Sequence, residues 1–283
     1  MNPTDALAAF EAHRALLFGI AYRMLGSAAD AEDLLQEARL RWLKGGTSEG
    51  VGSVRAFLVT VVSRLCLDQL DSARARRETY VGPWLPEPIA TTSESDPEHL
   101  SMAFLLLLER LTPQERAAFL LSEVFDYRHA EVAEVLGKSE EACRQLAARA
   151  RRAVHGERRQ QVDRAEHERV LSAFVGAIAT GDLSSLVGLL AADAVAHSDG
   201  GGRVRAARKV VLGADRVGRM LIGLAGKGAA QAIPEWCELN GLPAIRLREA
   251  GAIVSVLAVE VEGGVVRTVF LVNNPDKLHH ADA

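Results

Sequence analysis

Side chains suited to reading DNA bases stand close together in the middle of the sequence. Arg144 and Gln145 carry hydrogen-bond donors that fit the edges of guanine and adenine. From Arg144 to Arg159 there are six arginines against one acid, Glu157. Neutralising DNA phosphates requires such a local excess of positive charge. These residue types therefore indicate contact with nucleic acid.

A helix-turn-helix would carry these side chains into the major groove. The pattern predicts a short helix over about 129–136, a turn at 137–139 and a second helix, capped by Ser139, to about 152. In such motifs the N-terminal part of the second helix meets the bases. Taken alone, the unit is also compatible with an ordinary helical hairpin whose Arg-rich end is solvated. The residues expected at the DNA are Lys138, Ser139, Arg144, Gln145 and Arg149.

Two further charged segments precede this unit. The first is an acidic stretch on one helix, with Asp30, Glu32, Asp33, Gln36 and Glu37. The second is a basic stretch that ends a long helix and follows a loop, 45–52, containing four glycines. Each alone is typical of a solvated helix surface. The cations in or before this second stretch are Arg55, Arg64, Arg74, Arg76 and Arg77.

The elements that must position these residues are helical. Apolar residues recur at helical spacing over 5–43 with a break at Gly26-Ser27, and Ser53 is placed to cap the next helix. Further on, Thr112, Pro113 and Glu115 form the pattern of a capping box with proline at the first helical position.

Between these helical parts the composition changes. Residues 78–109 contain six acids and no lysine or arginine, and four prolines lie between 83 and 97. This predicts an extended linker over 79–97. After about residue 164 the pattern predicts helices followed by an antiparallel meander of strands, an α+β domain.

Composition bounds the class of protein. The 283 residues are 48% apolar and 25% charged, which excludes a wholly disordered chain and predicts two or three domains. The net charge of −4, taken alone, argues against a DNA-binding protein. Three scattered cysteines, Cys66, Cys143 and Cys237, predict neither a disulfide scaffold nor a metal site. Without a signal peptide or a membrane span, we expect a cytoplasmic protein with no cofactor and no membrane partner.

Taken in order, the charged segments resemble a known family. The stretch Tyr22-Arg23-Met24-Leu25-Gly26-Ser27-Ala28-Ala29-Asp30-Ala31-Glu32-Asp33-Leu34-Leu35-Gln36-Glu37 is similar to region 2 of bacterial extracytoplasmic-function sigma factors. The stretch from Leu111-Thr112-Pro113-Gln114-Glu115-Arg116 through the helix-turn-helix is similar to their region 4. The resemblance implies a dissociable RNA polymerase subunit that selects promoters and assists their opening, with no catalysis of its own.

The resemblance also implies roles for the charged residues. The acidic helix with Asp30, Glu32, Asp33, Gln36 and Glu37 would dock on the β′ clamp helices of core polymerase, and region 4 would lie near the β flap. The glycine-rich loop and the helix from Ser53 to Arg77 would bind the −10 element, and region 4 would bind the −35 element as duplex. The domains expected are region 2 at 1–78, the linker at 79–97, region 4 at 98–160 and a further domain at 164–283.

The last domain resembles a SnoaL-like domain of the NTF2-type cone fold. Three short motifs resemble those of sigma factors carrying such an extension: Trp84-Leu85-Pro86-Glu87-Pro88, Asp199-Gly200-Gly201-Gly202 and Asn274-Pro275-Asp276-Lys277-Leu278. In that subgroup the extension modulates activity in cis, in place of a separate anti-sigma protein. The residues expected at this regulatory contact are Trp84, Pro86, Asp199, Gly200, Asn274, Pro275, Asp276 and Lys277.

Alternatives remain open from the sequence. His197 and Asp199 are placed to line a pocket as acid–base groups of an enzyme or as part of a sensor for an unidentified small ligand. We favour a structural histidine and an aspartate that caps a glycine turn. The Asn274–Leu278 motif is compatible both with a plain turn after the last strand and with a contact to the sigma core. A helix-turn-helix repressor would leave the acidic helix unexplained.

Overall fold

The structure is a computed structural model that describes residues 3–46, 53–78, 80–92, 99–155, 163–228 and 232–282. The chain divides into two compact units. The first consists of Met1–Glu78 and Leu107–Arg158, and the second of Thr79–Leu106 and Arg159–Ala283. The segment between the two helical parts therefore belongs to the same unit as the C-terminal sheet. Most of the expected glycine-rich loop, residues 47–52, lies outside the described residues, as do residues 93–98.

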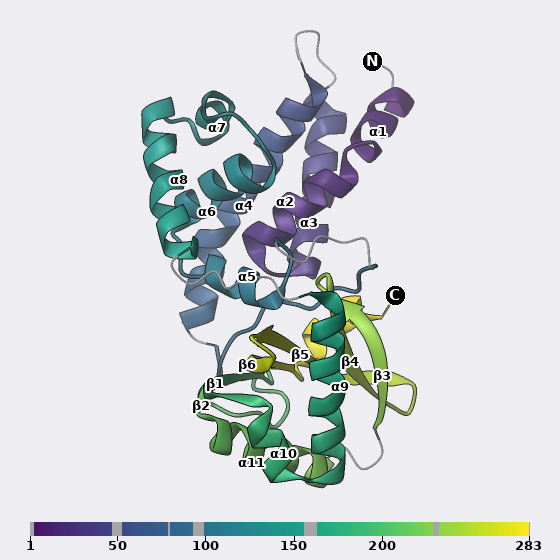
Figure 1. The fold of residues 1–283 in the computed structure, drawn as a ribbon. Helices are drawn as coiled ribbons and strands as arrows, with labels where there is room; N and C mark the ends of the chain where they lie inside the picture. Colours follow the sequence, from purple (N-terminus) through teal and green to yellow (C-terminus); the bar gives the residue numbers. More distant parts are fainter. Residues whose placement is uncertain are drawn as a thin grey trace. The chain divides into compact units, whose positions relative to one another are not determined.

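The first part of unit 1 consists of helices whose ends follow the local sequence (Figure 1). Gly26 adopts a left-handed conformation (φ 68°) that ends one helix, and Ser27 Oγ accepts a hydrogen bond from the N–H of Asp30 at 3.1 Å to begin the next. The predicted break is confirmed. The helices are α1 (Pro3–Glu11), α2 (Arg14–Leu25), α3 (Ala28–Arg41) and α4 (Val54–Glu78), with a π-helical turn at Trp42–Gly46.

The second part of unit 1 contains the predicted helix-turn-helix. Thr112 and Glu115 form the predicted capping box. Gly137 ends one helix at φ 62°, and Ser139 Oγ accepts from the N–H of Ala142 at 3.2 Å to cap the next. The elements are α6 (Pro113–Phe119), a π-helical turn (Leu120–Val124), α7 (His129–Leu136) and α8 (Glu140–His155).

Unit 2 is built on one six-stranded sheet with the order β2-β1-β6-β5-β4-β3. Strands β3 to β6 form the expected antiparallel meander, but β1 pairs with β6 in parallel, with Ala196 opposite Val269. The meander alone does not describe this sheet. The strands are β1 (Leu190–Asp199), β2 (Val211–Leu212), β3 (Ile233–Leu239), β4 (Leu242–Glu249), β5 (Ala252–Glu262) and β6 (Val265–Val272).

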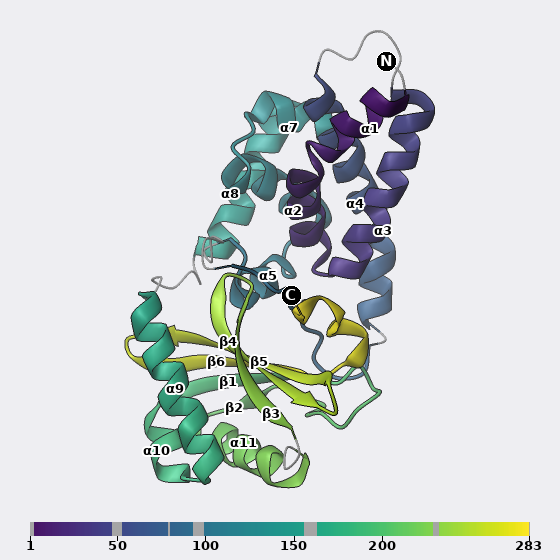
Figure 2. The same ribbon diagram turned by 90° about the vertical axis from the view of Figure 1, so that its right-hand side faces the viewer.

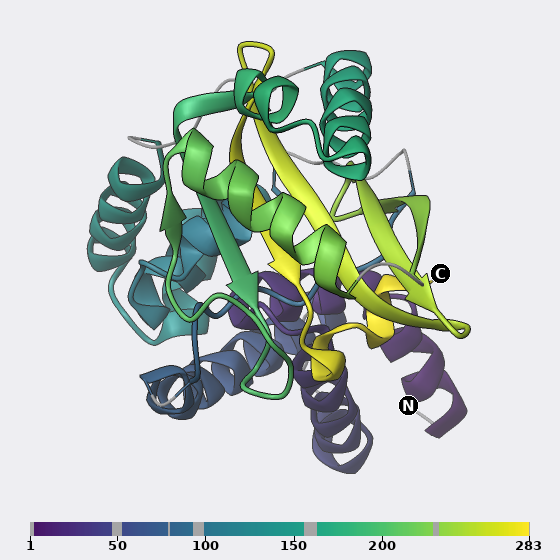
Figure 3. The ribbon, with the colours of Figure 1, turned by 90° about the horizontal axis from the view of Figure 1, so that it is seen from below.

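An apolar cluster packs on each face of this sheet. Helices α9 (Arg164–Thr180), α10 (Leu183–Gly188) and α11 (Ala214–Gly228) lie on one face (Figure 2), and α11 crosses the strands in Figure 3. The other face is covered by Leu85 of the expected linker and by Leu278 and Ala281 near the C-terminus, which pack with Phe270 and Val272.

The segment expected to be a linker is therefore ordered where the structure describes it. Leu85 is fully buried, and residues 86–88 are buried as well. The chain then runs along the end of β3, where Ala90 bridges Leu239 and the N–H of Thr91 donates to Glu238 O at 3.0 Å. The next helix is α5 (Met102–Leu108). No helix among the described residues has the length and apolar character needed to cross a bilayer.

Candidate functional site

The acidic residues of α3 form one face of that helix. Ala31, Leu34, Leu35 and Ala38 point into the core of unit 1. Their burial turns Asp33, Gln36 and Glu37 to solvent and leaves Asp30 and Glu32 partly exposed. Two of these acids are paired within the chain: Glu32 with Arg14 at 2.5 Å and Glu37 with Arg41 at 2.7 Å.

A hollow that was not predicted lies beside this acidic face. Its volume is about 480 Å³. Leu40, on its edge, is 51% exposed, which is high for a leucine. Apolar and charged side chains both line the hollow, and such a mixed surface suits a partner that offers both apolar and charged side chains. The lining residues are Phe10, Glu11, Arg14, Glu32, Leu35, Gln36, Arg39, Leu40 and Leu43.

Two arginines of helix α4 that were predicted to contact DNA phosphates have contacts within the protein. The side chain of Arg64 donates from Nε to Val135 O and from Nη2 to Glu134 O, both at 3.0 Å. These carbonyls belong to the last turn of α7, where a cation stabilises the helix end. Arg55 lies over the ring of Tyr127, 5.2 Å from its centroid, and donates to its hydroxyl.

Two arginines expected at DNA thus join region-2-like and region-4-like parts within unit 1. Arg74, Arg76 and Arg77 belong to the last turns of α4, and their side chains lie outside the described part of the chain.

Helix α8, the second helix of the helix-turn-helix, exposes the residues predicted to contact DNA. Cys143, Leu146, Ala147 and Ala150 are buried against α6 and its neighbours. This leaves Ser139, Arg144, Gln145 and Arg149 exposed and Lys138 partly exposed, as the helical period requires.

Acids of the same unit pair with three of these predicted DNA contacts. Arg144 contacts Glu140 at 3.0 Å and Glu141 at 3.3 Å, and Gln145 donates to Glu141 at 3.1 Å. Arg149 contacts Glu115 at 2.8 Å, and this hydrogen bond is the main reason why the pKa of Glu115 lies below its usual value. Binding DNA through these donors requires an exchange of carboxylate for phosphate or base.

Arg116 was not singled out from the sequence, yet it is 3% exposed. Its Nη1 donates to Met24 O at 2.6 Å and contacts Glu109 at 2.8 Å. Burial lowers the pKa of Arg116 to about 9. The residue ties the start of α6 to the end of α2. The only feature of the sequence that marks Arg116 is that it directly follows Glu115 of the capping box.

In unit 2 the three short motifs come together around Asp199, which is fully buried at the end of β1. Its Oδ1 accepts from Tyr80 Oη at 2.6 Å and from the N–H of Gly201 at 3.0 Å. Its Oδ2 accepts from the N–H of Leu85 at 2.9 Å and from Lys277 Nζ at 2.7 Å. Four donors therefore satisfy one buried carboxylate.

Lys277 brings the motif near the C-terminus to the same point. Its Nζ also donates to Leu85 O at 2.5 Å and lies 4.3 Å from the ring centroid of Trp84 and 5.0 Å from that of Tyr80. Cation–π contacts and a carboxylate compensate the burial of this ammonium group.

Asn274 Nδ2 completes the cluster by donating to Tyr80 Oη at 3.0 Å. We call Tyr80, Leu85, Asp199, Asn274 and Lys277 the linker clasp. Burial and the bond to Asp199 raise the pKa of Tyr80, which keeps its hydroxyl a donor.

Glycine is required beside the clasp. A Cβ on Gly200 would lie 2.6 Å from Val204 O, and one on Gly201, at φ 61°, would lie 2.4 Å from the Asn274 side chain. A side chain at Gly201 would push the two motifs apart, and one at Gly200 would displace the loop at Val204. Of the other predicted regulatory residues, Pro86 is buried, Pro275 begins a 3-10 turn after Asn274, and Asp276 forms an exposed pair with Arg203.

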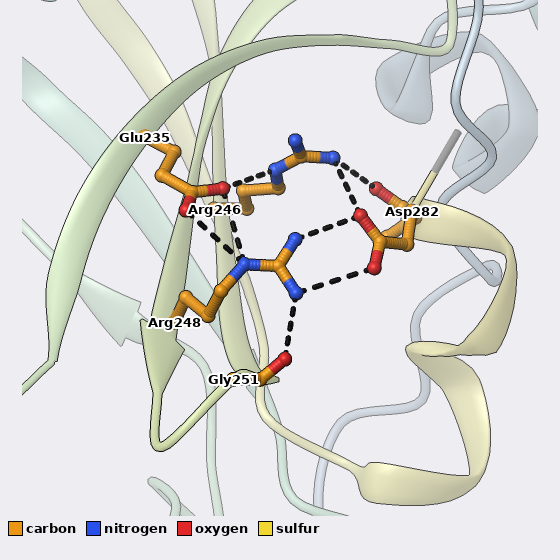
Figure 4. Close-up of polar contacts among 6 residues, drawn as sticks. Glu235, Arg246, Arg248, Gly251 and Asp282 are labelled. Atoms are coloured by element: carbon orange, nitrogen blue, oxygen red, sulfur yellow. Dashed lines mark hydrogen bonds and ion pairs between the residues drawn. The ribbon is translucent and has the colours of Figure 1, made fainter.

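A second polar cluster holds the C-terminal tail (Figure 4). Asp282 contacts Arg248 at 2.7 Å and Arg246 at 3.0 Å, and both arginines, on β4, contact Glu235 on β3. Nearer the linker, His280 Nδ1 lies 2.6 Å from Glu87 Oε1. The tail that carries Lys277 is thus fixed at both ends.

His197 does not join the clasp. Its ring stacks on that of Phe270, with centroids 6.0 Å apart and planes 17° apart. This arrangement fits a structural role for His197 and Asp199. Beyond capping its glycine turn, Asp199 also accepts hydrogen bonds from Tyr80, Leu85 and Lys277.

Comparisons with known proteins agree with this layout. Residues 9–76 match the family Sigma-70 region 2, and residues 101–154 match Sigma-70, region 4. The extracytoplasmic-function (ECF) RNA polymerase sigma factor SigJ of Mycobacterium tuberculosis is 42% identical over 289 residues, which cover 95% of this chain and 91% of that protein. The chain is an ECF sigma factor.

This sigma factor is similar to its relatives beyond regions 2 and 4. A probable ECF sigma factor SigI of Mycobacterium tuberculosis is 35% identical over 96% of this chain and 94% of its own length. The crystal structure of SigJ superposes with a TM-score of 0.78 at 38% identity, covering 97% of this chain and 98% of that one. The predicted order of regions 2 and 4 followed by a C-terminal α/β sheet domain is confirmed.

Proposed function

We propose that this sigma factor binds core RNA polymerase and promoter DNA through unit 1, and that a SnoaL-like domain of the NTF2 type, in unit 2, modulates this activity in cis through the linker clasp. The observation that carries the regulatory part is the buried Asp199. Two of its four hydrogen bonds, from Tyr80 and Leu85, join the C-terminal domain to the segment between regions 2 and 4, and the other two come from the C-terminal domain itself.

The docking surface for polymerase is the acidic face of α3. Asp33, Gln36 and Glu37 are exposed there, and the neighbouring hollow offers apolar contact at Leu40. We propose that this surface binds the clamp helices of core polymerase and that region 4 binds the β flap. A basic partner would be steered to the acids, and the apolar side chains of the hollow would add contact. A helix-turn-helix repressor does not need a surface that binds core polymerase.

Promoter contact is assigned to α4 and α8. On α8, phosphates and base edges would replace Glu140, Glu141 and Glu115 as partners of Arg144, Gln145 and Arg149. On α4, Arg55 and Arg64 become available only when their contacts to Tyr127 and to the end of α7 open. The free chain therefore holds these five DNA-binding groups in internal pairs. We place the protein, together with core polymerase, in the cytoplasm.

The connectivity of the chain allows the clasp to act on regions 2 and 4. The linker joins region 2 to region 4, yet residues 80–91 are bound to the C-terminal domain. The length of chain left to separate the two regions depends on whether the clasp holds. We infer that the clasp restrains the protein in the way that a separate anti-sigma protein would.

Catalysis by the C-terminal domain is disfavoured. A general acid or base must reach a substrate proton, whereas Asp199 is fully buried with four internal donors. The sheet face opposite the helices is covered by Leu85 and Leu278. We therefore propose a regulatory and non-enzymatic domain.

The core of the proposal is tested by adding the full-length chain to core polymerase and a candidate promoter library. Specific transcripts are expected, and the variant Asp33→Arg/Glu37→Arg should bind core polymerase at least tenfold more weakly. The control Asp193→Arg/Glu168→Arg carries the same charge change at exposed positions of unit 2. Absence of binding by the wild-type chain, or equal binding by both variants, contradicts the assignment.

A further inference from the structure

The loop between β1 and β2, whose path Figure 2 shows, lies outside regions 2 and 4. Its sequence concentrates positive charge. From Gly200 to Ala214 there are four cations and no acid. All four are exposed, although the chain as a whole has a net charge of −4. They are Arg203, Arg205, Arg208 and Lys209.

Three of these cations are available to a partner. Arg203 is paired with Asp276 at 2.8 Å. The side chains of Arg205, Arg208 and Lys209 have no hydrogen bond or ion pair with any residue that the structure describes. The situation differs on α8, where Arg144 and Arg149 each have an acidic partner.

The loop is supported on its inner side by the segment that leads into the clasp. The N–H groups of Arg203 and Val204 donate to Gly200 O at 2.9 and 3.2 Å. Gly82 lies against the backbone of residues 207–208, and a Cβ on Gly202 would meet Val81 Cβ at 3.2 Å. The cations are therefore held on a backbone of defined shape.

We propose that this loop, the basic loop, binds the phosphate backbone of duplex DNA. The proposal rests on the proposed promoter binding and adds a DNA contact in the C-terminal unit. Two of the three available cations are arginines, whose guanidinium fork matches phosphate oxygens. Duplex DNA offers one negative charge per about 1.7 Å of axis, so that adjacent cations find adjacent partners.

The composition of the loop also sets the kind of contact. Residues 200–214 contain no aromatic side chain to stack on bases and no asparagine or glutamine to read adenine. The contact is with phosphates and is independent of sequence.

Salt-dependent binding tests the proposal with holoenzyme made from the full-length chain, core polymerase and a promoter duplex that the wild-type holoenzyme transcribes. The test variant is Arg205→Gln/Arg208→Gln. The control Arg169→Gln/Arg267→Gln removes the same charge from α9 and β6 of the same unit. We expect the test variant to bind DNA about tenfold more weakly at low salt, with a log–log salt slope smaller by about 1.8, since each phosphate contact contributes about 0.9.

The outcomes separate the alternatives. Equal slopes for wild type and test variant overturn the proposal, and so does an equal change in the control. If the test variant instead loses affinity for core polymerase, the loop binds protein and the proposal is wrong. Failure of the wild-type chain to form a transcribing holoenzyme would contradict the proposed function itself.

Discussion

Asp199 shows how much one side chain contributes to unit 2. It is fully buried, and its negative charge is compensated by Lys277 and by three further donors. Removing one partner of a buried pair leaves the other uncompensated, which costs about 3 kcal/mol or more. We predict that Asp199→Asn lowers the free energy of unfolding of the full chain by about this amount, as measured by urea denaturation.

Asp193→Asn is the matched control, because Asp193 lies on the same strand but is exposed and pairs with Arg267 at the surface. The double variant Asp199→Asn/Lys277→Met should recover part of the loss. Equal free energies of unfolding for Asp199→Asn and Asp193→Asn would show that the clasp does not stabilise the protein.

His167 makes the stability of unit 2 depend on pH. It is 2% exposed, and neither ring nitrogen has a hydrogen-bond partner among the described residues. Burial lowers its pKa. The unfolded chain then binds a proton at higher pH than the folded chain, so the free energy of unfolding falls as pH drops below about 6.5.

We predict that His167→Leu removes this part of the pH dependence between pH 8 and 5.5, measured by urea denaturation at both values. The neighbouring charges on its helix, Arg164 and Glu168, remain in place as internal controls. An unchanged pH profile in the variant would contradict the assignment.

At this scale the sequence indicated which residues of the three motifs matter, but not their contacts. Asp199, Asn274 and Lys277 were predicted as regulatory residues, whereas Tyr80 and the N–H of Leu85 were not. A backbone donor carries no sequence signal, and contacts across 114 or 119 positions follow from tertiary packing alone.

At the scale of elements, α8 makes a specific prediction for base reading. Arg144 is exposed near the start of the helix, where recognition helices meet base edges. Arg144→Ala should weaken holoenzyme binding at one base position of the −35 element by about 1–3 kcal/mol. The measurement compares promoter duplexes with single substitutions. Equal loss on every sequence would mean that Arg144 contacts only phosphate.

Helices α4 and α7 make a second prediction. Arg64 donates two hydrogen bonds to the last turn of α7 from an exposed position. We expect Arg64→Ala to cost about 1 kcal/mol and to speed amide hydrogen exchange in α7 of the full chain. The exposed Arg39 of α3 provides the control variant Arg39→Ala. Unchanged exchange in α7 would show that this contact does not hold the two regions together.

Local sequence predicted the helices and their caps because glycine, serine and the capping box act within a few residues. It did not predict the parallel pairing of β1 with β6, since strands far apart in the chain supply that pairing. The linker was predicted as extended from its prolines, but proline content does not reveal which surface such a segment covers.

At the scale of the molecule, the net charge of −4 is a sum over separated surfaces. An acidic α3 and an acid-rich segment at 78–109 offset the arginines of α8 and the basic loop. The C-terminal domain is also not a simple appendage, because its unit includes Thr79–Leu106 from between regions 2 and 4. The proposed regulation in cis rests on this connectivity.

The most direct test of the account is in vitro transcription by holoenzymes containing the full-length wild type, Asp199→Asn, Lys277→Met or the control Asp193→Asn. We predict that the two clasp variants raise transcript yield several-fold at equal core polymerase affinity, because the linker is released, whereas the control matches the wild type. Clasp variants that match the wild type, or that lose activity while still binding polymerase, would contradict a restraining clasp.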